Sequence, residues 1–274
     1  MQIGIFAKTF AVTGAVPVLK AVSDAGYDVA QFNMASVGLP SMPDVIAPEL
    51  AEEIAKASAA TGVAIAAVSG TYNMIHPDPA MRADGMDRLA AIIHAAPLMG
   101  TRLVTLCTGT RDPQDQWKHH PENPSAGAWR DLLGELAKAV TLAEDNGVDL
   151  GIEPELSNVV SSAEQAHRLI SEMQSPRLRI VLDPANLFEV ATVDESRSII
   201  ARAVDILGGR IVMAHAKDRR ADGGFVAAGK GVIDFPHFIG CLRSAGLDGP
   251  LVTHGLHEDE AAGVAAFLRG IISP

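Results

Sequence analysis

The sequence predicts an α/β fold, namely a (β/α)8 barrel formed by a single domain over residues 1–274. Three observations support this prediction. Short apolar runs alternate with helical patterns eight times, which is typical of parallel strands joined by helices. The loops that follow the strands are longer than those that precede them, as in barrels whose functional face lies at the strand ends. The length of 274 residues also suits one such barrel, for which about 250 residues is typical.

Eight apolar runs are the predicted strands. The strand segments are 3–8, 24–32, 60–68, 98–106, 145–153, 178–186, 207–215 and 244–252. In six of these segments a helical pattern ends in a glycine, where a left-handed residue is expected, and the apolar strand follows at once. These glycines are Gly26, Gly62, Gly100, Gly147, Gly209 and Gly246. Before the sixth strand, Ser175 and Pro176 form the helix stop instead.

Helical patterns fill the intervals between the predicted strands. The clearest helices are 50–60, 86–99, 129–144, 163–173 and 195–207. Long loops follow the strands at 70–79, 109–127 and 217–234. The polar loop 109–127 carries Trp117, and we expect either a solvated excursion or a lid over a bound substrate. An open doubly wound sheet is the structural alternative, but eight repeats favour closure into a barrel.

Polar residues at the ends of successive strands carry most of the functional information. Glu153, Asp183 and His215 end three apolar runs and are 30 and 32 residues apart, which is one strand–helix repeat each time. Because consecutive strand ends lie side by side in a barrel, two carboxylates and an imidazole should converge on one face. Such groups bind divalent metals, and a buried carboxylate needs a partner of this kind. His254 follows His215 by 39 residues and is the fourth candidate ligand.

Composition limits the class of partner. The formal net charge of −11 opposes binding to a nucleic-acid backbone, which needs clustered Lys and Arg. No run approaches the roughly 18 apolar residues that span a bilayer, and the amino terminus lacks the pattern of a signal peptide. We therefore expect a cytoplasmic location and a small-molecule substrate. Cys107 and Cys241 stand in apolar contexts and are expected to be free thiols.

The motifs LGIEPE, VLDPANLF, HAKD, GKGVIDF and GPLVTHG resemble those of a known family. They are similar, in strand order, to the sugar-phosphate isomerase/epimerase group of xylose isomerase-like TIM barrels. That group includes tagatose 3-epimerase-like enzymes, hydroxypyruvate isomerases and inosose dehydratases, and it is related to endonuclease IV. The resemblance implies one divalent metal (manganese, zinc, cobalt or magnesium) held by Glu, Asp, His and Glu at the ends of strands five to eight. Glu153, Asp183 and His215 match this pattern, whereas His254 stands in place of the second Glu.

The resemblance also implies a mechanism. A metal that chelates the carbonyl and hydroxyl oxygens of the substrate acidifies the C–H between them and stabilises an enediolate. Glu153 is then both ligand and principal base. Lys217 is expected to bind a substrate oxygen, unless it only forms a salt bridge with Asp218. His254 is expected to be a ligand that takes part in catalysis, or else only a substrate contact, and its presence makes two-base epimerisation less expected than isomerisation.

Several residues are expected at the substrate. Relatives place a substrate-binding Arg near Arg219 and Arg220, and a substrate-contacting His near His76. Asn186 is expected there because relatives often have a His three residues after the Asp. Lys8 ends the first strand and is expected either to face the cavity or to pair with a carboxylate, and Trp117 lies in the possible lid 109–127.

The sequence therefore predicts a metal-dependent isomerase or epimerase of a small sugar, sugar acid or hydroxy-keto compound. A dehydratase on the same scaffold is the main alternative. A metal-free ligand-binding barrel and an endonuclease IV-like phosphodiesterase are less favoured, the latter because it needs a metal cluster and a basic groove. The resemblance also leaves a homo-oligomer open.

Overall fold

Eight parallel strands close into a barrel in the computed structural model, which describes residues 1–272. These strands are β1 (Gln2–Phe6), β2 (Val29–Phe32), β3 (Ala64–Ser69), β4 (Leu103–Leu106), β5 (Asp149–Ile152), β6 (Leu178–Leu182), β7 (Ile211–Arg219) and β9 (Pro250–Thr253). Their order in the sheet is β6-β5-β4-β3-β2-β1-β9-β7, and β6 also pairs with β7. This last pairing closes the sheet, which confirms the predicted (β/α)8 TIM barrel and excludes the open sheet.

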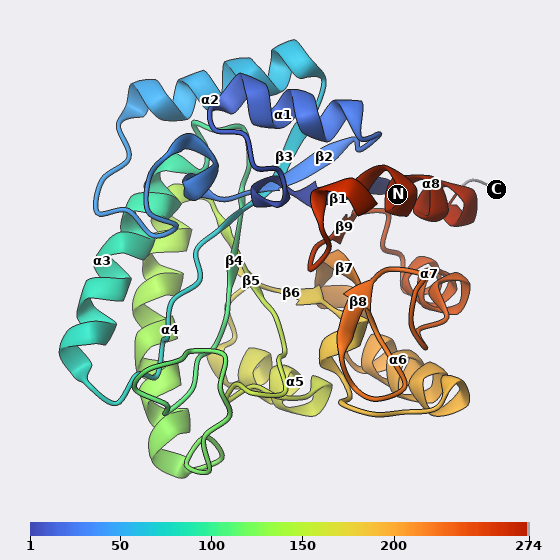
Figure 1. The fold of residues 1–274 in the computed structure, drawn as a ribbon. Helices are drawn as coiled ribbons and strands as arrows, with labels where there is room; N and C mark the ends of the chain where they lie inside the picture. Colours follow the sequence, from blue (N-terminus) through green and yellow to red (C-terminus); the bar gives the residue numbers. More distant parts are fainter. Residues whose placement is uncertain (273–274) are drawn as a thin grey trace.

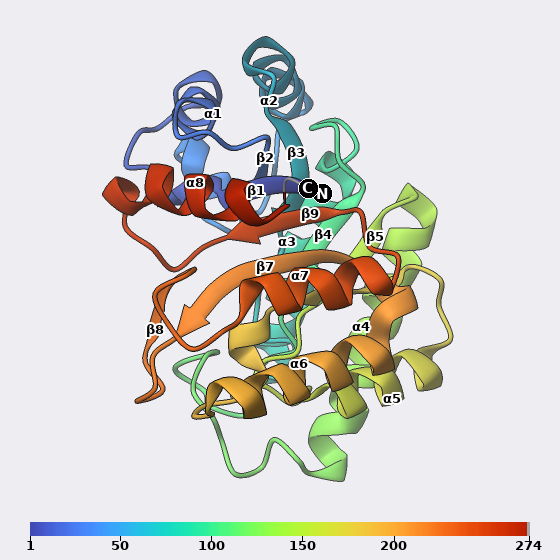
Figure 2. The ribbon, with the colours of Figure 1, turned by 90° about the vertical axis from the view of Figure 1, so that its right-hand side faces the viewer.

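Helices form a ring around the strands (Figures 1 and 2). They are α1 (Ala15–Asp24), α2 (Pro48–Thr61), α3 (Pro79–Ala95), α4 (Ala126–Asn146), α5 (Ala163–Met173), α6 (Val193–Leu207), α7 (Phe235–Ser244) and α8 (Ala261–Ile272). Helix α5 has the predicted bounds, and α3 begins earlier than predicted because Asp78 caps its amino end and Pro79 starts its first turn. Within residues 1–272, no helix has both the length and the apolar character needed to cross a membrane.

The helix ends agree with the predicted glycine pattern at five of six positions. Gly26, Gly62, Gly100, Gly147 and Gly246 all have positive φ. The prediction for Gly209 is wrong, because Gly208–Arg210 continues from α6 as a short 3-10 helix and leads directly into β7. At the predicted Ser175–Pro176 stop, Gln174 takes the left-handed conformation with φ 52°.

An additional strand, β8 (Phe225–Ala227), was not predicted from the sequence. Strand β7 runs to Arg219, beyond its predicted end, and β8 folds back to pair with it in antiparallel fashion. Asp218 holds this hairpin together by accepting backbone N–H bonds from Gly229, Gly231 and Ile233 at 2.8–3.1 Å. The hairpin therefore projects from the end of the barrel as an ordered part of the loop 217–234 (Figure 2).

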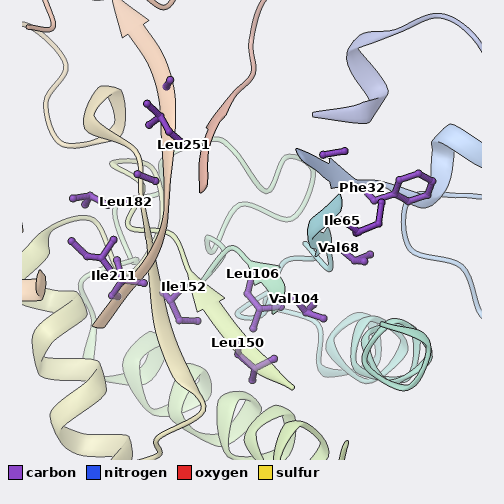
Figure 3. Packing of buried hydrophobic residues seen from close by; sticks show 14 of the residues in the cluster. Phe32, Ile65, Val68, Val104, Leu106, Leu150, Ile152, Leu182, Ile211 and Leu251 are labelled. Atoms are coloured by element: carbon purple, nitrogen blue, oxygen red, sulfur yellow. The ribbon is translucent and has the colours of Figure 1, made fainter. Parts of the chain in front are cut away.

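Two apolar layers hold the barrel together. The larger lies between the strands and the helices, and Figure 3 shows part of it, including Phe32, Leu106 and Ile152. The smaller lies inside the barrel and consists of Ala67, Val181, Met213 and Val252, with Phe6, Ala66 and Leu103 packed against it. Alternation along the strands separates the two sets, because successive side chains point to opposite faces. Strand β3 departs from it, since its register against β2 shifts at Ala66 and both Ala66 and Ala67 belong to the interior layer.

The interior layer accepts only small residues at some strand positions. A Cβ atom on Gly151 would lie 2.7 Å from Val181 Cγ2 and 3.2 Å from Leu103 Cδ1.

We therefore expect Gly151→Ala to lower the free energy of unfolding by about 1–3 kcal/mol through overpacking. Urea unfolding would measure this. Gly134→Ala on the exposed side of α4 is the matched control, since nothing lies within 4 Å of the added Cβ. It should raise stability by about 0.4–1 kcal/mol, and equal effects of the two changes would contradict the packing argument.

Candidate metal centre

Four side chains from four neighbouring strand ends meet at one end of the barrel. Glu153 follows β5, Asp183 follows β6, His215 lies in β7, and His254 follows β9. Each offers one ligand atom, and these four atoms all lie within 4.8 Å of one another. Two ligands at about 2.0–2.2 Å from an ion are at most about 4.4 Å apart, so small rotations would bring the four around one ion. The convergence expected from the sequence spacing is therefore present.

Asp183 is the centre of this cluster. Its Oδ2 accepts hydrogen bonds from His254 Nε2 at 3.0 Å and from Lys217 Nζ at 3.2 Å. Its Oδ1 accepts the backbone N–H of Ala185 at 2.9 Å, which fixes the carboxylate at the start of a short 3-10 helix. Burial alone would raise the pKa of Asp183, but Lys217 and His254 outweigh it and hold the pKa below its ordinary value. Lys217 thus pairs with Asp183, not with Asp218.

Gln31 of β2 sets the orientation of His215 by contacting the ring nitrogen that points away from Glu153. The ring Nε2 of His215 lies 3.0 Å from Gln31 Oε1. Gln31 Nε2 in turn donates to Ser69 Oγ and Thr105 Oγ1, both at 3.1 Å, so its amide oxygen is the group that faces the ring. His215 Nε2 therefore carries the proton, and Nδ1 faces Glu153 Oε1 at 3.3 Å. This is the arrangement that leaves an imidazole lone pair for a metal.

Gln31 is thus a functional candidate that sequence analysis missed. The signal was an amide within the otherwise apolar segment VAQF, at a position that is 2% exposed. Replacement by leucine should weaken divalent-metal affinity by about 10–100-fold, as the loss of outer partners typically does. Manganese titration by calorimetry would measure it. Gln31→Glu keeps an acceptor for His215 and should bind more tightly than Gln31→Leu, whereas wild-type affinity in Gln31→Leu would rule out the orienting role.

His254 is held between aromatic rings. The ring of Phe6 stacks on it at a centroid distance of 4.5 Å, and the ring of His215 meets it edge-on at 4.7 Å. Burial lowers the pKa of His254 to about 4, although Asp183 acts in the opposite direction. The imidazole is therefore neutral near pH 7, which is the form that binds metal.

The carboxylate of Glu153 lies next to His215 and Asn186. Burial raises the pKa of Glu153, but His215 in its protonated form and Lys217 act in the opposite direction, so the net direction is downward. Asn186 donates to Glu153 Oε1 at 2.8 Å and accepts from Lys217 Nζ at 2.8 Å. Asn186 therefore links the carboxylate and the ammonium across the floor of the site.

A cavity of about 590 Å³ opens above this cluster. Its wall includes Lys8, Trp117, Asn186, Lys217 and Arg219, all of which the sequence placed at the substrate. Its volume lies in the range of small-molecule sites. A larger groove of about 1130 Å³ lies outside the barrel among α5, α6 and α7, but none of the four clustered residues lines it. The convergence of ligands, not size, identifies the candidate site.

Arg219 is fixed beside the cavity by the β7–β8 hairpin. Its Nε donates to Ala185 O at 2.5 Å and its guanidinium also donates to Gly223 O at 2.6 Å. The ring of Phe225 lies under both cations, 4.1 Å from the guanidinium of Arg219 and 4.0 Å from Lys217 Nζ. Phe225 and β8 thus complete a wall whose cations face the cavity.

Two residues expected at the substrate do not line this cavity. Lys217 and Arg219 share a face of β7 and line the cavity, whereas Arg220 follows the end of the strand, is exposed and pairs with Asp222. His76 lines a neighbouring groove instead of this cavity. Glu155 lines the cavity without having been assigned a role, and burial raises its pKa to about 7. Cys107 and Cys241 are free thiols, as expected.

Comparisons with known proteins agree with the barrel fold. A sequence model described as xylose isomerase-like TIM barrel matches residues 19–270. Among curated proteins, none matches this chain in sequence.

Solved structures with the same fold include three with names that refer to epimerases. The 3-keto-D-glucoside 4-epimerase of E. coli is 16% identical, with a TM-score of 0.77 over 98% of this chain and 99% of that one. A D-psicose 3-epimerase of Clostridium cellulolyticum H10 is 15% identical, with a TM-score of 0.77 over all of both chains. A D-tagatose 3-epimerase-like protein is 15% identical, with a TM-score of 0.78 over 99% and 97%. At these identities the likeness establishes the fold.

Proposed function

Because this chain belongs to the family of xylose isomerase-like TIM barrels, we propose that it is a divalent-metal-dependent isomerase or epimerase of a small keto-sugar or related hydroxy-keto compound. The observation that carries the proposal is the set of four ligand atoms within 4.8 Å of one another beneath a cavity of about 590 Å³. The names of the solved relatives, which are epimerases of sugars, support the same substrate class.

The donor set fits a divalent ion. Glu153, Asp183, His215 and His254 would hold it, with two carboxylates that balance the charge of the ion and two imidazoles. When bound, the ion supplies Lewis-acid polarisation of a substrate carbonyl and the adjacent hydroxyl. The residues around it must then move a proton and stabilise the charge that develops.

We assign the movement of that proton to Glu153. Its carboxylate borders the cavity, and Asn186 fixes its Oε1 at 2.8 Å. Lys217 Nζ lies on the same side, linked through Asn186, and supplies donors for an oxygen that gains negative charge. One carboxylate base and one ammonium donor are sufficient for proton transfer between adjacent carbons on one face of a substrate.

His254 favours isomerisation over two-base epimerisation in this proposal. The family resemblance implies a second Glu at this strand end, and here an imidazole in contact with Asp183 takes its place. A dehydratase remains the alternative function, and it would release a product lighter by one water.

The test combines metal analysis with exchange in deuterated water. Metal content and activity after EDTA treatment would show whether the reaction needs a divalent ion. Keto-sugars incubated with the metal-loaded protein in D2O should incorporate deuterium at the carbon that loses its proton, and mass spectrometry would separate isomers from a dehydrated product. Full activity after complete metal removal would refute the proposal.

A further inference from the structure

The cavity of about 590 Å³ above the four clustered residues is called here the metal-side cavity. A second hollow of about 440 Å³ adjoins it and is called the outer groove. Thr71 and Trp117 line both spaces, so the two hollows meet at these side chains. The groove lies between the loop after β3, the first turns of α3 and the loop after β4, and it includes His76, Asp84 and Gln114. None of the four clustered residues lines it.

We propose that the substrate carries a second, neutral glycosyl unit, and that this unit binds in the outer groove while the reacting sugar lies at the metal-side cavity. The proposal rests on the proposed function of the main site. It assigns the outer groove as a second sugar subsite with Trp117 as the platform between the two units.

Trp117 has the properties of such a platform. Its side chain is 50% exposed, whereas Trp129, the other tryptophan of the chain, is 8% exposed and donates its Nε1 proton to Glu172. An exposed indole offers a flat apolar face at little entropic cost, which suits stacking against the C–H face of a sugar ring. Its position where the two hollows meet lets one ring contact two adjoining sugar units.

The loop around Trp117 is held in place on both sides. Asp112 Oδ1 accepts backbone N–H bonds from Gln114 at 2.9 Å and from Asp115 at 3.0 Å. After the tryptophan, Thr110 Oγ1 donates to Lys118 O at 2.8 Å, and Lys118 Nζ pairs with Asp112 at 3.0 Å. These bonds hold the backbone of the loop on both sides of Trp117, so the position from which the exposed indole extends is defined.

The charges of the outer groove favour a neutral ligand. The guanidinium of Arg88 is already paired with Asp44 at 3.0 Å and with Asp84 at 3.2 Å. Both ring nitrogens of His76 have backbone partners, because Nδ1 accepts from Asp78 N–H and Nε2 lies 3.2 Å from Pro113 O. Arg88 is the one Arg or Lys among the lining residues, and Asp84, Asp112 and Asp115 line the same groove, so a phosphate or carboxylate would meet more negative than positive charge.

Hydroxyl groups, in contrast, match the polar lining. Gln114 and Gln116 carry amides that both donate and accept, and Asp84 and Asp115 are exposed acceptors. The metal-side cavity differs, since its lining includes the cations Lys8, Lys217 and Arg219. The two spaces thus suit different parts of one molecule, a reacting hydroxy-ketone and a neutral polyol attached to it.

Ketose disaccharides provide a direct test. Calorimetry on the manganese-loaded protein would compare D-fructose with turanose, maltulose, leucrose and palatinose, which carry glucose on oxygens 3, 4, 5 and 6 of fructose. We expect at least one disaccharide to bind 10-fold or more tightly than D-fructose. Met81 lines the groove and is 53% exposed, so Met81→Trp should fill the groove and abolish this preference.

Ala83→Trp is the matched control, because it adds the same side chain to an exposed position of the same helix outside the groove lining, and it should keep the preference. Thermal unfolding would verify that both variants are folded.

If all four disaccharides bind no more tightly than D-fructose, or if Met81→Trp retains the preference, the subsite is refuted. Deuterium exchange separates the two claims: tighter disaccharide binding without exchange refutes the reaction alone, and exchange without any disaccharide preference refutes the subsite alone.

Discussion

Replacement of Glu153 by glutamine is expected to lower turnover by about 10²–10⁴-fold, the usual contribution of a general base. Glutamine keeps the size of the side chain and a coordinating oxygen, so the cluster can still assemble, but the amide cannot take up a proton. The hydrogen bond from Asn186 to this side chain, 2.8 Å in the native protein, can also persist. Steady-state kinetics on the keto-sugar that shows the fastest deuterium exchange would measure the loss.

Two further measurements make this result specific. Metal content by mass spectrometry must show that Glu153→Gln is still loaded, since loss of the ion would lower turnover for another reason. Glu189→Gln is the matched control, because Glu189 is an exposed carboxylate at the rim of the same cavity and should be replaceable with a small effect. Near-normal turnover in metal-loaded Glu153→Gln would remove Glu153 from the role of base.

Replacement of His254 by alanine is expected to weaken divalent-metal affinity by more than about 100-fold, because loss of partners outside the ligand shell already costs 10–100-fold. The change also removes the hydrogen bond to Asp183 Oδ2 and the stacking partner of Phe6. Metal titration by calorimetry measures the affinity directly and does not depend on activity.

A second variant, His254→Glu, tests whether residue 254 is a ligand by changing the chemistry of the donor set. It restores the carboxylate that the family resemblance implies at this position, so metal should be retained. Three carboxylates and one imidazole are a harder donor set than two and two, and preference should therefore move from zinc toward magnesium and manganese. Unchanged metal affinity in His254→Ala would show that the ring contacts only substrate or water, and unchanged selectivity in His254→Glu would argue against its being a ligand.

Much of the fold and of the metal cluster was predictable from local patterns. The strands and helices follow from apolar periodicity, and the closure of the barrel follows from eight repeats. Glu153, Asp183, His215 and His254 could be grouped because barrel geometry brings successive strand ends together, whatever the detail of the helices between them. Lys217 and Arg219 followed from the alternation of side chains along β7.

Other features depended on contacts between residues far apart in the chain. Gln31 is 184 residues from His215, and nothing in its local sequence indicates that its amide would meet the imidazole ring. The β7–β8 hairpin depends on Asp218 collecting backbone N–H groups from 11 to 15 residues away, so its strand was missed. His76 was expected at the substrate, but the loop after β3 carries it into the outer groove, where backbone groups engage its ring.

The sequence by itself determined the barrel and the identity of the four clustered side chains, because both follow from periodicities that repeat along the chain. Only the tertiary structure decided which nitrogen of His215 faces the cluster, that Lys217 pairs with Asp183, and that Trp117 stands between two hollows. The physical reason is that hydrogen-bond direction and cavity shape depend on distances of a few tenths of an ångström between distant segments. Strand and helix patterns do not encode such distances, and the packing of the complete barrel fixes them.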